Sequence, residues 1–346
     1  MSMMLDFNSM RFVVKMVLGK ILGQNHPFLV QLSVTNRCNC RCRYCYADYY
    51  NRPTEDLPLG EIKSLLDTLK KRGAFRINLV GGEPMLRSDI SEIIRHVKRR
   101  QMHCAMTTNG YHVAERIGEL AGINLICFSI DGRPENNDEN RGKGAYKRSL
   151  AGLEACQDAG IPVQISSVLT RQTVHDVDYL VALAEKYTCK VGFATMIGKK
   201  EKCAKNTLFH PSESETRKAL SRIIELKKQK KPILFSRKIY EYAHQWPDYN
   251  KGLIFKEDTL PEIIKCYAGK KFCIIDYNGD VYPCPQLVGH YNPMNAIHDG
   301  LDKALKKASR HECMACPVPC SNEFSAFFGF VPEVLIDSFR TYSGKK

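Results

Sequence analysis

The sequence predicts an α/β fold, an open (β/α)6 partial barrel followed by a small cysteine-rich C-terminal module. Three observations lead to this prediction. Short apolar runs alternate with helix-like patterns up to residue 197, polar motifs follow the ends of several runs, and cysteine, proline and glycine punctuate residues 266–320. Such alternation is typical of right-handed βαβ units that build a parallel sheet. Ligands of parallel α/β folds bind at the carboxyl ends of the strands, so the functional residues are expected there.

The apolar runs give the predicted strands, and the amphipathic patterns between them give the predicted helices. The strands are expected at Leu29–Thr35, Arg76–Val80, Cys104–Thr108, Leu125–Ser129, Val163–Leu169 and Val191–Ile197. The helices are expected at Leu59–Lys71, Ser88–Arg100, Val113–Ala121, Tyr146–Ala159 and Val177–Tyr187.

The chain divides into five predicted segments. Residues 1–26 form an amphipathic helix that is expected to pack on the body of the protein, with contact to a membrane surface as the less favoured alternative. Residues 27–198 are the barrel, and residues 199–261 are a polar, mainly helical bridge. Residues 262–325 are expected to form a loop-rich module with little apolar core, which would need a bound metal for stability. Residues 326–346 form a tail that is expected to dock on the barrel.

The composition is that of an ordinary globular protein. The chain has 346 residues, of which 44% are hydrophobic, and a net charge of +14 that is dispersed along the sequence. We therefore expect no nucleic-acid partner. No stretch approaches the ~20 apolar residues of a membrane span. The 15 cysteines, without a signal peptide, favour a reducing cytoplasm over a disulfide-bonded secreted protein.

Three cysteines follow the first predicted strand. Cys38, Cys42 and Cys45 have the spacing C-x3-C-x2-C, with Tyr44 before the last. Three thiolates on one loop can hold three irons of a 4Fe–4S cluster and leave the fourth iron open to a substrate or cofactor. The alternative is a zinc site with Cys40 as fourth ligand, but this spacing is cramped for zinc. We interpret Cys40 as a bystander.

Two further motifs follow the second and third predicted strands. In Gly81-Gly82-Glu83-Pro84, the glycines allow the backbone to approach a ligand, and the carboxylate can hold an ammonium group. Asn109 belongs to a Thr-Asn-Gly sequence that fits either a plain turn or a contact in the same pocket.

The cysteine loop and these motifs resemble the radical S-adenosylmethionine (radical SAM) superfamily. The Ser-Ile-Asp-Gly sequence at Ser129 and the Arg-Gly sequence at Arg141 resemble it as well. The resemblance implies a TIM-like partial barrel and a 4Fe–4S cluster whose open iron binds S-adenosylmethionine. In the family, the Gly-Gly-Glu-Pro motif contacts the amino group of S-adenosylmethionine, and the serine and arginine hold its carboxylate, which suits an arginine fork.

Position along the strands suggests two more contacts, Ser167 with the ribose and Ile197 with the adenine. No general base or other catalytic side chain is assigned. The cofactor-binding residues expected from the resemblance are Tyr44, Gly81, Gly82, Glu83, Pro84, Asn109, Ser129, Asp131, Arg141, Ser167 and Ile197.

The C-terminal cysteines resemble the SPASM domain, which carries auxiliary 4Fe–4S clusters in peptide-modifying members of the family. Cys266-x12-Gly279-x4-Cys284 matches its opening, but the later cysteines are fewer than two clusters require. The resemblance therefore implies a shortened, twitch-like module with one auxiliary cluster, and a structural zinc ribbon is the alternative. Pro285 replaces the aspartate of sulfatase-maturing relatives, which argues against that activity. The expected ligands are Cys266, Cys284 and two of Cys313, Cys316 and Cys320, with Cys273 in reserve.

The implied activity is reductive cleavage of S-adenosylmethionine to a 5′-deoxyadenosyl radical that abstracts hydrogen from a substrate. Our first hypothesis is modification of a peptide or protein side chain, as in maturases of ribosomally made peptides. The alternatives are a small-molecule or lipid-linked substrate, and a non-enzyme that carries electrons or is stabilised by zinc. A reductant such as flavodoxin or ferredoxin is the expected protein partner.

Overall fold

The computed structural model describes residues 26–42, 44–47, 52, 55–196, 209–255 and 264–342, with the side chains of 339–342 excepted. Ile197 and nearly all of the predicted N-terminal helix lie outside these residues. Within the described part, no helix is both long enough and apolar enough to cross a membrane.

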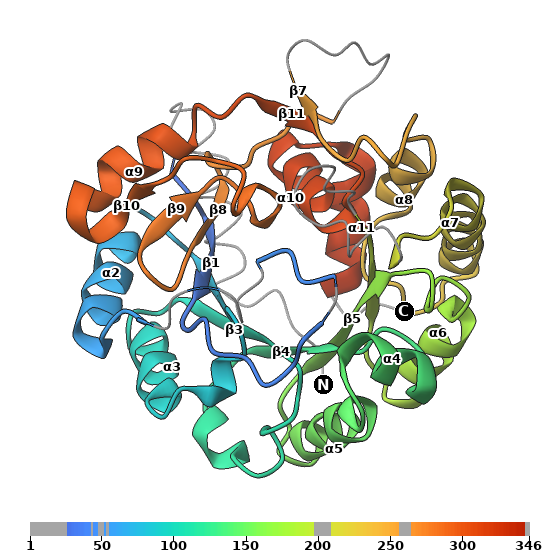
Figure 1. Cartoon of the computed structure of the whole chain (residues 1–346), viewed down its shortest axis with the longest axis horizontal. Helices are drawn as coiled ribbons and strands as arrows, with labels where there is room; N and C mark the ends of the chain where they lie inside the picture. The colour runs from blue at the N-terminus through green and yellow to red at the C-terminus, as the bar shows by residue number, and fades with distance from the viewer. Residues whose placement is uncertain are drawn as a thin grey trace.

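The six predicted strands are present as neighbours in one parallel sheet, which curves into the open barrel seen end-on in Figure 1. Their observed ends differ from the predicted ones by at most two residues, so this part of the fold prediction is confirmed. The strands are β1 Leu29–Ser33, β2 Arg76–Val80, β3 His103–Thr108, β4 Leu125–Ser129, β5 Val163–Leu169 and β6 Val191–Thr195.

Helices cover the outside of this sheet (Figure 1). They bury apolar stripes, such as Ile62, Leu66 and Leu69 of α2, in one core with Ile77 and Leu79 of β2. The helices and 3-10 helices of this part are α2 Leu59–Lys71, η2 Pro84–Leu86, α3 Ile90–Arg99, η3 Ile117–Leu120, α4 Pro134–Arg141, α5 Ala145–Asp158 and α6 Val177–Lys186.

Two local predictions fail. The helix predicted at Val113–Ala121 is a run of turns followed by the short η3, and a glycine at 118 weakens helix formation there. Helix α4 was not predicted because its sequence, PENNDENR, has no apolar stripe. It forms instead around a proline at its first turn and the buried amides of Asn137 and Asn140.

The chain after residue 209 adds more strands to the same sheet. β8 pairs with β1 in parallel, so the sheet has 9 strands in the order β10-β9-β8-β1-β2-β3-β4-β5-β6. The C-terminal module is therefore continuous with the barrel at this edge. Its elements and those of the bridge are α7 Glu213–Lys228, α8 Arg237–His244, β7 Ile254–Phe255, β8 Phe272–Ile275, β9 Asp280–Tyr282, η5 Pro285–Leu287, β10 Met294–Asn295, π-helix η6 Ala296–Gly300, α9 Leu301–Ala308, β11 Cys313–Ala315, α10 Pro319–Gly329 and α11 Pro332–Tyr342.

The helices at the end of the described chain contact the rest of the protein. α10 contacts β6 and α8, and Phe328 stacks on Phe28 with 5.7 Å between the ring centroids. α10 also crosses residue 325, where the sequence suggested a boundary between module and tail.

Candidate active site

The cysteine loop is held against the motif that follows β2 by backbone contacts that only glycine permits. The amide of Gly82 donates to the carbonyl of Thr35 at 2.8 Å, and the amide of Glu83 donates to the carbonyl of Arg37 at 2.8 Å. A Cβ at Gly82 would lie 2.1 Å from the Arg37 oxygen, and Gly81 has a φ of +136°. In this structure the two glycines therefore admit the backbone of the cysteine loop.

The structure brings the three predicted cysteines together. Burial raises the pKa of Cys38 to about 12, and the neighbouring Cys42 and Cys45 add to that rise. The amide of Cys45 donates to the carbonyl of Cys42 at 3.1 Å. A hydrogen bond from Cys40 and the nearby charge of Arg141 lower the pKa of Cys42 to about 7. Cys40, interpreted as a bystander, is a buried neighbour of the set.

Glu83 ties this loop to the end of β3. Its carboxylate is buried and accepts hydrogen bonds from the hydroxyl of Thr108 at 2.6 Å and the amide of Asn109 at 2.7 Å. Burial raises the pKa of Glu83, and these bonds oppose the rise. The side chain of Asn109 in turn donates to the sulfur of Cys40 at 3.3 Å. Both carboxylate oxygens are thus engaged within the protein.

Asp131 forms a second polar connection at the ends of β4 and β5. Its buried carboxylate accepts from Nε of Arg141 at 2.7 Å, from the amide of Val168 at 3.1 Å and from the hydroxyl of Tyr44. The Arg141 guanidinium lies 5.6 Å from the centre of the Tyr44 ring and 3.9 Å, through Nη1, from the sulfur of Cys42. The cysteine loop is therefore held by polar groups from both sides.

The two predicted serines face opposite sides of the sheet. Ser129 is partly exposed at the end of β4, on the face that looks into the barrel. Ser167 is fully buried, on the same side of β5 as Ile165 and Leu169, and donates to the backbone oxygen of Asp131 at 3.0 Å. Its neighbour Ser166 is the serine of β5 that faces the interior. The alternation of side chains along β5 is the sequence signal that favours Ser166, rather than Ser167, as the serine that faces the interior.

The structure gathers four of the six C-terminal thiols. Burial raises the pKa of Cys316, and the negative charges that Cys266, Cys284 and Cys313 would carry raise it further. The same mutual effect acts on Cys284 and Cys313. The other two thiols lie apart from this group. Cys273 is buried on β8, paired in register with Val30, and Cys320 is in the first turn of α10.

Within the described ranges, no three His, Cys, Asp or Glu side chains are placed to hold a single metal ion. A single zinc needs every sulfur about 2.3 Å from one centre. A 4Fe–4S cluster instead takes each thiolate on a different iron, so its ligands stand farther apart. The mutual effects on pKa show that the thiols of each group are near one another.

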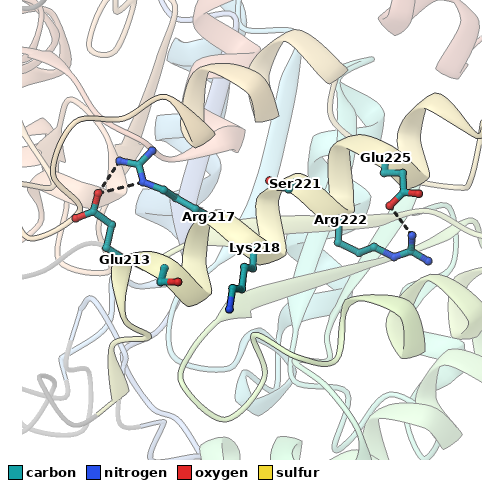
Figure 2. A pocket seen from close by; sticks show the side chains of 7 residues that line it. Glu213, Arg217, Lys218, Ser221, Arg222 and Glu225 are labelled. Atoms are coloured by element: carbon teal, nitrogen blue, oxygen red, sulfur yellow. Dashed lines mark hydrogen bonds and ion pairs between the residues drawn. The ribbon is translucent and has the colours of Figure 1, made fainter.

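A separate hollow lies on the outer surface of α7 (Figure 2). Four of its charged side chains form two ion pairs, Arg217 with Glu213 at 2.6 Å and Arg222 with Glu225 at 2.6 Å. It contains none of the predicted site residues, and we do not assign it to the active site.

Comparison with known proteins agrees with this geometry. Residues 32–184 match the radical SAM superfamily. The mycofactocin maturase MftC of Mycolicibacterium smegmatis is 26% identical over 284 residues, which are 80% of this chain and 69% of the relative. The AdoMet-dependent heme synthase of Nitratidesulfovibrio vulgaris is 27% identical over 278 residues, which are 75% of this chain and 74% of the relative.

A solved structure shares the fold. Streptococcus suis SuiB bound to precursor peptide SuiA superposes with a TM-score of 0.63 at 16% identity, covering 88% of this chain and 70% of that one. The cysteine loop at the end of β1, the strand-end motifs and the match over residues 32–184 show that this enzyme contains a radical SAM domain, whose cofactors are a 4Fe–4S cluster and S-adenosylmethionine.

Proposed function

We propose that this enzyme modifies a side chain of a peptide or protein. The observation that carries the proposal is the similarity to the mycofactocin maturase, which extends over 80% of the chain. A matched length of 284 residues exceeds the superfamily match at 32–184 and so takes in sequence beyond the barrel core. SuiB, a structure captured with a precursor peptide, supports the same substrate class.

Cys38, Cys42 and Cys45 are the proposed cluster ligands, because they are near one another at the carboxyl end of β1. When bound, the cluster and S-adenosylmethionine supply a 5′-deoxyadenosyl radical that abstracts hydrogen from an unactivated carbon. Arg141 and Ser129 are proposed to bind the carboxylate of S-adenosylmethionine. Glu83 is proposed to contact the amino group of S-adenosylmethionine, while its hydrogen bonds orient Thr108 and Asn109.

The proposed ligands of one auxiliary cluster are Cys266, Cys284, Cys313 and Cys316. Replacing Cys316 by alanine should lower the iron content of the reconstituted enzyme from about 8 toward about 4 atoms per chain. Cys320→Ala, the matched control, should keep the full content. Equal iron loss in both variants would contradict this ligand set, and full iron in Cys316→Ala would do the same.

A second candidate is a tetrapyrrole substrate. The specific observation in its favour is the similarity to a heme synthase, which at 27% identity and 75% coverage is close to the similarity to the maturase. The two candidates separate in a direct assay, because a tetrapyrrole substrate would change its absorption spectrum and a peptide substrate would change its mass.

The decisive experiment is anaerobic. The enzyme is reconstituted with iron and sulfide, reduced with dithionite, given S-adenosylmethionine and assayed for 5′-deoxyadenosine. The wild type should form it, and the Cys38/Cys42/Cys45→Ala variant should not, whereas Cys156→Ala, which changes a buried core thiol, should retain activity. A fully loaded wild type that neither binds S-adenosylmethionine nor cleaves it would overturn the proposal.

We also propose the setting in which the enzyme works. The sequence favours a reducing cytoplasm, and flavodoxin or ferredoxin is the proposed source of electrons. The proposed units are the core barrel at 27–198, the helical bridge at 199–261 and the cluster module at 262–325, with the tail docked on them.

A further inference from the structure

The two faces of the parallel sheet carry different side chains. On β4, Ile126 and Phe128 pack into the core beneath the helices, so Cys127 and Ser129 face the barrel interior. The same alternation turns Gln164 and Ser166 of β5 inward. Ser129, Gln164 and Ser166 stay partly exposed although helices cover the other face, so solvent reaches the interior. Neutral groups that form hydrogen bonds therefore line this space.

Arg76 is a charged residue that faces the interior at the amino end of the sheet. Arg76 begins β2 and pairs in register with His103, the first residue of β3. Their neighbours Ile77 and Cys104 belong to the core under the helices, which turns Arg76 and His103 toward the interior. Among the described residues, no carboxylate forms an ion pair with Arg76. Its Nε and the Nδ1 of His103 are buried without a hydrogen-bond partner.

The effect of Arg76 reaches across the interior. Burial raises the pKa of the Cys127 thiol on β4, while a hydrogen bond with Gln164 and the positive charge of Arg76 lower it. Burial, together with the charges of Arg76 and Lys98, lowers the pKa of His103 to about 3. His103 is thus neutral at pH 7 and can donate one hydrogen bond without adding charge. Arg76 supplies the positive charge of the pair.

Arg76 is partly exposed, but its buried Nε has no hydrogen-bond partner, and a bound carboxylate would supply both that partner and a counter-charge. The planar fork of N–H groups of an arginine suits a carboxylate. We propose that Arg76 and His103 bind a carboxylate of the substrate at the amino end of the barrel interior, which we call the floor. This inference rests on the proposed function and narrows its substrate class to peptides with an acidic side chain or a free chain terminus at the anchoring position.

The location suits an anchor rather than a reacting group. Val80 is four positions after Arg76 along β2, so the floor lies about 13 Å from the strand end where the cysteine loop lies. Binding energy obtained at a distance from the reacting carbon can position the substrate for hydrogen abstraction.

The test measures thermal unfolding of the full reconstituted enzyme with S-adenosylmethionine. N-acetylglutamic acid amide probes a side-chain carboxylate, and N-acetylalanine probes a chain-terminal one. Their amides, N-acetylglutamine amide and N-acetylalanine amide, are the neutral comparators. At least one acid should raise the Tm by about 2 °C or more at saturation, and neither neutral comparator should. The acid that does so distinguishes the two sources of the carboxylate.

Arg76→Gln should abolish the shift without lowering the Tm of the probe-free enzyme, and Arg76→Lys should reduce the shift because it keeps charge but loses the fork. Lys98→Gln, which removes a nearby cation that donates to Asn124, is the matched control and should keep the shift. A probe-free Tm that falls in both Arg76 variants, or no shift with either acid, would overturn the proposal. Wild-type 5′-deoxyadenosine formation is measured on the same preparation, and its absence would count against the proposed function alone.

Discussion

Replacing Asp131 by asparagine removes the negative charge that holds Arg141 and Tyr44 together. The Asp131 carboxylate is 0% exposed, and the Arg141 side chain is only 9% exposed. Removing one partner of such a pair leaves the other charge buried and costs about 3–5 kcal/mol. Asparagine has nearly the same shape, so the loss reflects charge rather than a cavity. We therefore expect Asp131→Asn to lower the free energy of unfolding by about that amount.

The measurement is urea unfolding of the metal-free protein at pH 7. The matched control is Asp176→Asn, since Asp176 is also buried, at 4% exposed, but its partner Arg133 is 52% exposed. Water can solvate Arg133 when the pair breaks, so this control should lose only about 1 kcal/mol. Adding Arg141→Met to Asp131→Asn should restore part of the lost stability. The reasoning is refuted if Asp131→Asn loses no more than Asp176→Asn.

Two other changes give equally specific results. Gly82→Ala would place a Cβ 2.1 Å from the Arg37 oxygen and should lower the free energy of unfolding of the metal-free protein by more than about 2 kcal/mol. The control is Gly60→Ala in α2, where the new Cβ meets nothing within 4 Å, so this variant should be neutral or stabilising. Equal effects of the two substitutions would contradict the argument from the close approach at Gly82. His103 has a folded pKa of about 3 against an ordinary 6.5, so the unfolded chain binds more protons between these values and stability rises with pH there. His103→Gln should remove that rise, which amounts to about 3 kcal/mol between pH 4 and pH 7, in urea unfolding at the two pH values. An unchanged slope would count against burial of a neutral His103.

The strands were predictable because local pattern and tertiary role agree. Each is a short apolar run with a turn signal behind it, and the burial that creates this pattern is the burial seen in the sheet. Helix α4, in contrast, could not be predicted from an apolar pattern. Its buried groups are the amides of Asn137 and Asn140, which a search for apolar periodicity passes over. The place of β8 in the sheet could not be predicted from local sequence either, because the residues around Phe272 do not indicate that Phe272 pairs with Leu29, far away in the sequence.

For the candidate site, the sequence predicted which residues come together at the strand ends better than it predicted the contacts between them. The cysteine spacing and the glycine motif select the residues that meet at the strand ends. Spacing alone does not show that Gly82 faces a loop carbonyl or that Glu83 is already satisfied. Likewise, six C-terminal cysteines offer several sets of four, and only the fold separates Cys273, on β8, from Cys316. These distinctions depend on contacts between residues distant in sequence.

The four gathered thiols lie where the C-terminal module meets the barrel. Cys284 and Cys313 share an apolar cluster with Phe28 and Phe272, on the side of the sheet where β8 joins β1. Pro317, next to Cys316, accepts a hydrogen bond from Thr195 at the end of β6, on the other side of the opening. On the proposed assignment, a cluster bound here links the part of the sheet where β8 joins β1 to the edge strand β6. Cluster loading should therefore stabilise the barrel itself as well as the module, because binding free energy of a metal site becomes folding free energy.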